Sequence, residues 1–129
     1  MPGGFTLILH RQADEGVEWK LEVRFLPDTA TVSLFYPTAG RRATDALSPL
    51  ESAELRKLTE RSRLDEGGHI GYVGGTLETL AFRDLENGRT VVLVTGGNKN
   101  FVEDPARRAL LQLLRALEGR LLSGAAPPP

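Results

Sequence analysis

The segment Val17-Glu18-Trp19-Lys20-Leu21-Glu22-Val23-Arg24-Phe25 decides the fold class. Its apolar side chains alternate with charged ones, and successive side chains of a β-strand point to opposite faces of a sheet. The alternation predicts a strand with one buried and one wetted face. Such a strand is typical of an antiparallel sheet.

Two more strands are predicted beside this one, over residues 5–11 and 30–36. Both show the period-two alternation, and Pro27 and Asp28 supply a turn before the second of them. Short connections of this kind predict an antiparallel meander of three strands, followed by a loop over residues 37–45. In the first of these strands Phe5, Leu7 and Leu9 share one face and Thr6, Ile8 and His10 share the other. In the second strand Val32, Leu34 and Tyr36 are expected to face the core.

Helix-start signals occur twice in the sequence. Ser48-Pro49-Leu50-Glu51 combines an N-cap serine, a proline at the first helical position and a capping glutamate, so it predicts a helix to about Arg63 that stops at Gly67-Gly68. Asp104-Pro105 predicts a second helix to about Leu122. The expected apolar positions are Leu47, Leu50, Leu55 and Leu58 in the first helix and Ala106, Leu110, Leu113, Leu114, Leu117 and Leu121 in the second.

A β-hairpin is predicted around Asn87-Gly88, because both central residues of a type I′ turn need positive φ. Counting outward from this turn pairs Glu86 with Arg89 and Phe82 with Leu93. The run 91–94 is apolar on both faces, so we expect a central strand that helices cover. The chain then reads as an α+β domain over residues 1–122, with a mainly antiparallel sheet (a three-stranded meander, then a hairpin), two helices packed on it and the order βββαβ(β)βα. Residues 123–129, rich in Pro and Ala, are expected to be a disordered tail.

Composition narrows the function classes. Sixteen Lys and Arg balance seventeen Asp and Glu, so we expect neither nucleic acid nor a membrane surface as partner. The chain has no cysteine and two histidines, which excludes thiolate chemistry and multi-histidine metal centres, and we expect no cofactor and no metal. An N-terminal apolar run of about five residues is too short for a signal peptide, so the expected location is cytoplasmic.

Two glycine-rich segments are the candidates for a binding site. Residues 91–100 resemble the first strand and glycine turn of short-chain dehydrogenases, but Asn100 and Val102 stand where later glycines must admit a pyrophosphate. Lys99 also lacks the following Ser or Thr of a phosphate-binding loop. The segment 67–75 holds five glycines and suits either a mobile contact loop or an irregular loop without a role. The proposed contact residues are His69, Tyr72, Asn98, Lys99 and Asn100.

The absence of a catalytic constellation favours a small non-enzymatic protein-binding domain of the inhibitor, immunity or adaptor type, acting through a surface loop. The alternative is a small-ligand-binding protein or a hydrolytic enzyme with a pocket near His69 or His10. Leu111 and Leu122 lie off the main stripe of the last predicted helix. They suggest a monomer or a weak homodimer through those two leucines.

Element order also resembles that of emfourin-type inhibitors of thermolysin-like metalloproteases. The corresponding pieces are Gly3-Gly4-Phe5, Ser48 to Leu64, Leu77 to Thr95 and Asp104 to Leu122. In that family the Gly-Gly-Phe element follows the first strand, whereas here it precedes it, and we carry over no contact residue. The resemblance implies a protease as the protein partner, and a toxin is the other partner class considered, from the immunity-type hypothesis.

Overall fold

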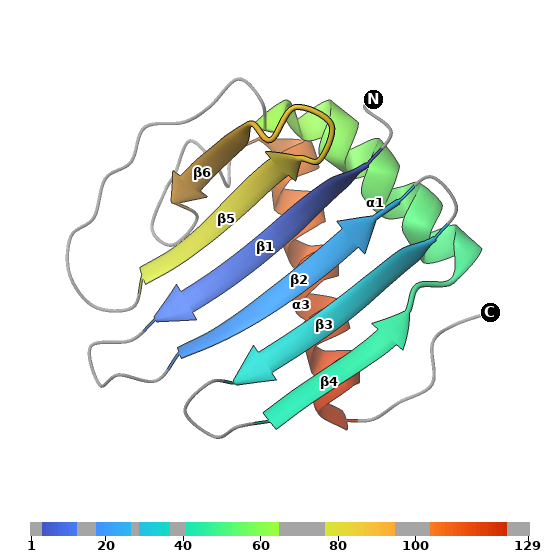
Figure 1. The fold of residues 1–129 in the computed structure, drawn as a ribbon, viewed down its shortest axis with the longest axis vertical. Helices are drawn as coiled ribbons and strands as arrows, with labels where there is room; N and C mark the ends of the chain where they lie inside the picture. Colours follow the sequence, from blue (N-terminus) through green and yellow to red (C-terminus); the bar gives the residue numbers. More distant parts are fainter. Residues whose placement is uncertain are drawn as a thin grey trace.

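The computed structural model describes residues 4–12, 18–26, 29–36, 41–64, 77–94 and 104–123. Within these ranges the chain forms a six-stranded antiparallel sheet with two helices on one of its faces (Figure 1). The predicted α+β class is therefore confirmed. The elements are β1 (Phe5–Gln12), β2 (Glu18–Phe25), β3 (Ala30–Tyr36), β4 (Arg41–Ala46), α1 (Pro49–Ser62), β5 (Leu77–Asp84), β6 (Thr90–Val94) and α3 (Pro105–Ser123).

The strand order is β4-β3-β2-β1-β5-β6, so the first strand of the chain lies inside the sheet. Leu9 of β1 faces Leu21 of β2 on one side and Leu80 of β5 on the other. The three predicted strands of the meander are confirmed. The meander continues into β4, so the prediction of a loop over residues 37–45 is wrong for residues 41–45. β4 escaped notice because its sequence, RRATDA, has no apolar alternation.

The hairpin of β5 and β6 is confirmed, but its predicted register is wrong by two residues. Phe82 faces Val91, and Leu93 faces Leu80. Gly88 has a positive φ of 74°, as the turn requires. Asn87 does not, because Arg63 is the one non-glycine residue with positive φ in the described part of the chain. Asn87 therefore does not adopt the type I′ conformation, and Glu86 and Arg89 lie in a longer connection. An even shift keeps every side chain on its predicted face.

β6 lies at an edge of the sheet, which overturns the prediction of a central strand covered by helices. Leu93 faces the helices and is 2% exposed, while Val92 points the other way and is 40% exposed. Apolar residues on both faces of a strand indicated burial on both faces. Here only one face of β6 packs against the core.

α1 begins and ends with defined caps. The Ser48 hydroxyl accepts from the Glu51 amide (3.2 Å), and the Glu51 carboxylate accepts from the Ser48 amide (3.2 Å), as the capping box predicts. The last residue of the helix is Ser62, close to the predicted end, and the C-cap residue Arg63 is left-handed with φ 50°. The predicted stop at Gly67-Gly68 lies outside the described residues. Leu50, expected on the apolar face of the helix, is instead 67% exposed.

α3 follows the predicted pattern closely. Leu110, Leu114 and Leu117 are buried against the sheet and α1. Leu111 is also buried, at 4% exposure, so the expectation that it marks a dimer surface is wrong, whereas Leu122 is 45% exposed. Of the predicted tail, Ser123 is the last residue of α3, and residues 124–129 lie outside the described ranges.

Candidate functional site

The five predicted contact residues, His69, Tyr72, Asn98, Lys99 and Asn100, lie outside the described residues. Their role stays a prediction. His10, the candidate for a pocket, is half-buried on β1 and points away from the helices, like Thr6 and Ile8 on the same strand.

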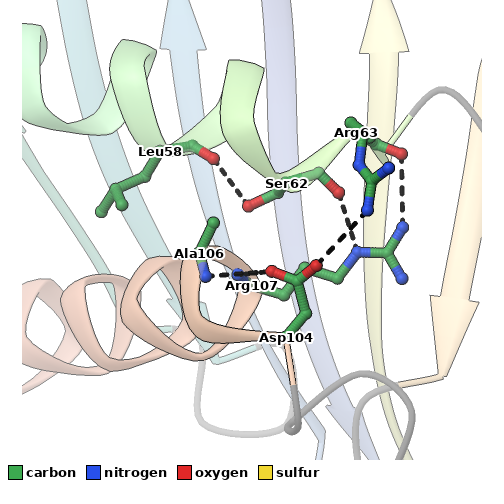
Figure 2. A network of polar contacts seen from close by, with 6 residues as sticks. All are labelled: Leu58, Ser62, Arg63, Asp104, Ala106 and Arg107. Atoms are coloured by element: carbon green, nitrogen blue, oxygen red, sulfur yellow. Dashed lines mark hydrogen bonds and ion pairs between the residues drawn. The ribbon is translucent and has the colours of Figure 1, made fainter.

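The end of α1 meets the start of α3 in a closed polar junction (Figure 2). The Asp104 carboxylate caps α3 by accepting from the amides of Ala106 (2.9 Å) and Arg107 (3.1 Å). The Arg107 guanidinium donates to the carbonyls of Ser62 (2.8 Å) and Arg63 (3.3 Å). The Asp104 carboxylate thus lies at the N-terminus of α3, and the Arg107 guanidinium lies at the C-terminus of α1. Both positions are favourable for the dipole of the helix concerned. These contacts hold the two helices in register.

The opposite end of the helix pair carries a second ionic contact. Arg120 of α3 has a side chain only 9% exposed and pairs with Glu51 in the first turn of α1. Its second terminal nitrogen lies 3.7 Å from the Asp45 carboxylate of β4. Burial alone would raise the pKa of Glu51, but hydrogen bonds from Arg120 and from Ser48 outweigh it and hold that pKa below its usual value. Glu51 is therefore ionised at neutral pH.

Beside this pair, a groove of about 460 Å³ runs between α1 and α3. Four of its lining residues are apolar and three are charged, with more acidic than basic groups. The lining consists of Leu50, Glu51, Glu54, Leu113, Ala116, Leu117 and Arg120. The groove offers apolar contact together with exposed carboxylate, and it does not include His10.

A buried carboxylate lies between the sheet and α3, on the helix-covered face. Glu78 of β5 is 3% exposed and accepts from Arg11 (2.7 Å) and Arg115 (3.0 Å). The Arg11 guanidinium also lies 4.6 Å from the centroid of the Trp19 ring. Burial raises the pKa of nearby Glu118, opposed by Arg11 and Arg115 and reinforced by Glu78. The groove between the helices reaches neither carboxyl, and the ion pairs of Glu78 with Arg11 and Arg115 join α3 to the sheet.

Sequence reasoning missed the groove because its walls come from opposite parts of the chain. Leu50 and Leu113 were both assigned to buried stripes, and no local pattern pairs Glu51 with Arg120. The exposed position of Leu50 follows only from the way α1 packs.

In the ranges that the structure describes, no three His, Asp or Glu residues gather to hold a metal ion. Neither of the described helices is long and apolar enough to cross a membrane. Comparison of the sequence with models of known protein families and with curated proteins finds no match.

Proposed function

We propose that the chain is a small, non-enzymatic protein-binding domain of the inhibitor, immunity or adaptor type. The observation that supports this most is the groove between α1 and α3, where Leu50 is 67% exposed beside Leu113 and Leu117. Grooves between helices accept the apolar face of an amphipathic helix from a partner. An exposed leucine in such a groove adds apolar contact area to the interface.

The charges around the groove indicate the chemistry of that partner. Glu51 forms an ion pair with Arg120, whereas Glu54 is exposed. The lining of the groove therefore carries two carboxylates and one guanidinium. The occupant is an amphipathic helix with a Lys or Arg near its apolar face. The resemblance to emfourin-type inhibitors supports a protease as the partner, and a toxin is the other class considered. The loop residues His69, Tyr72 and Asn98 form a second contact in this proposal.

The test is affinity capture from extracts of the source cells with wild-type protein, Leu50→Glu and Ala53→Glu. Both substitutions place a glutamate at an exposed position of α1, but only Leu50 lines the groove. A stoichiometric protein should be recovered by wild type and Ala53→Glu, and lost with Leu50→Glu.

Failure to recover any stoichiometric protein, or equal recovery by all three chains, contradicts binding at the groove. Tyr72→Ala and Asn98→Ala test the loop separately. They should weaken capture while the denaturation midpoint stays at that of the wild type.

A further inference from the structure

Both helices lie behind the sheet in Figure 1, so the face turned toward the viewer is one that no described element covers. Leu7 and Leu9 of β1 point to the helices and are fully buried. Thr6, Ile8 and His10 point to the uncovered face. Thr6 is buried at 5% exposure and Ile8 and His10 are half-buried, whereas Arg24 and Arg83 on the neighbouring strands are exposed.

Arg24 of β2 and Arg83 of β5 lie in one row across this face. Each pairs with Thr6 of β1, which stands between them. Since neighbouring strands are about 4.8 Å apart, the Cα atoms of the two arginines are about 10 Å apart. Both side chains are exposed, and within the described residues neither forms an ion pair.

Lys20 of β2 and Arg42 of β4 form a second row, on either side of Phe35 of β3. Phe35 is 36% exposed, and the Arg42 guanidinium lies 5.9 Å from its ring centroid. Lys20 and Arg24 are four positions apart on one strand, so the two rows are about 13 Å apart. We call this patch the basic sheet face, and its cations are Lys20, Arg24, Arg42 and Arg83.

Charge on this face is segregated from the rest of the molecule. Four cations, Lys20, Arg24, Arg42 and Arg83, outnumber the two carboxylate positions that the register gives this face, Glu22 and Glu18, whereas the whole chain has a net charge of −1. A positive patch on a nearly neutral protein attracts a negative partner over a short range and fixes its orientation.

We propose that the basic sheet face binds an acidic segment of a protein partner. Single-stranded nucleic acids stack successive bases on several aromatic side chains, but Phe35 is the one aromatic side chain among the described residues of this face. Glu22 also lies in the row between the two cationic rows, where it repels a continuous phosphate chain. Separate carboxylates of a protein segment can face each row and leave Glu22 uncovered. This surface is distinct from the groove, and either can fail without the other.

The test is a titration of ¹⁵N-labelled protein with short poly-L-glutamate, followed by amide chemical shifts. The double variant Arg24→Glu/Arg83→Glu is compared with Lys57→Glu/Arg61→Glu, which makes the same change of net charge at exposed positions of α1. Wild type should bind with shifts in β2, β4 and β5, and salt should weaken the binding. The sheet variant should bind at least about tenfold more weakly, and the α1 variant should bind within about twofold of wild type.

Equal weakening in both variants, or shifts confined to α1 and α3, would overturn the proposal. So would tighter binding of an oligothymidylate of equal charge, because it would assign the face to nucleic acid. Denaturation of both variants at the wild-type midpoint shows that the comparison concerns binding and not folding.

Discussion

The two faces of the sheet use arginine differently. On the helix-covered side, arginines donate to a carboxylate or a carbonyl that joins two elements; these are Arg11, Arg107, Arg115 and Arg120. On the uncovered side, Arg24, Arg42 and Arg83 form no ion pair within the described residues. The same residue type therefore joins the layers on one side and remains available to a partner on the other.

The largest expected effect separates two neighbours on β1. Leu9 is 0% exposed and faces the helices, so Leu9→Ala should lower the free energy of unfolding by about 3 kcal/mol through lost burial and a cavity. Ile8 is half-buried on the uncovered face, and Ile8→Ala should cost about 1 kcal/mol. Urea denaturation measures both. Equal losses would mean that the uncovered face is as buried as the other.

The buried carboxylate gives the next contrast. Glu78→Gln leaves Arg11 and Arg115 without their anion, and the loss should be about 2 kcal/mol because both arginines are partly exposed to solvent. Glu22→Gln, on the uncovered face, should stay within about 0.5 kcal/mol of wild type. A small loss at Glu78 would show that water replaces the ion pairs, and the two faces would then not differ in this respect.

Replacing a single arginine on each side of the sheet should change the free energy of unfolding by a smaller amount. Arg107→Gln removes the hydrogen bonds to the end of α1 and should cost about 1 kcal/mol, measured as a lower denaturation midpoint. Arg24→Gln should change the free energy of unfolding by less than about 0.5 kcal/mol. The comparison of the faces breaks down if Arg24→Gln destabilises the fold as much as Arg107→Gln does.

The smallest expected effect concerns pH. Because burial raises the pKa of Glu118 in the folded state, its contribution to stability is complete below the unfolded pKa and is lost as pH rises through the folded pKa. Glu118→Gln should therefore be slightly more stable than wild type at neutral pH, and its stability should depend less on pH across the carboxyl range. Unfolding measured at several pH values tests this, and a loss of stability at neutral pH would contradict it.

Local chemistry was sufficient to predict most elements. The caps Ser48 and Asp104 locate both helix starts, and the alternation in β2 and β3 assigns their buried faces correctly. Pairing between distant segments was not predictable. β4 has no apolar alternation of its own, and β6 has the composition of a central strand but lies at an edge.

The same limit applies to the candidate sites. Glu51 and Arg120 meet only because α1 and α3 pack side by side, and Arg24 and Arg83 share a row only because β1 lies between their strands. The charged positions of β2 were recognised as a wetted face. Their combination with Arg42 and Arg83 required the strand order.

The interior position of β1 also has a consequence for the order of folding. β1 pairs with β2, which follows it directly, and with β5, from which β2, β3, β4 and α1 separate it along the chain. Pairing of β1 through β4 and of β5 with β6 closes short loops, whereas the ladder between Phe5 and Asp84 closes a long one. Non-local pairing of this kind slows folding. We therefore expect the meander and the hairpin to form as separate units, and their joining along β1 to limit the rate at which the chain folds.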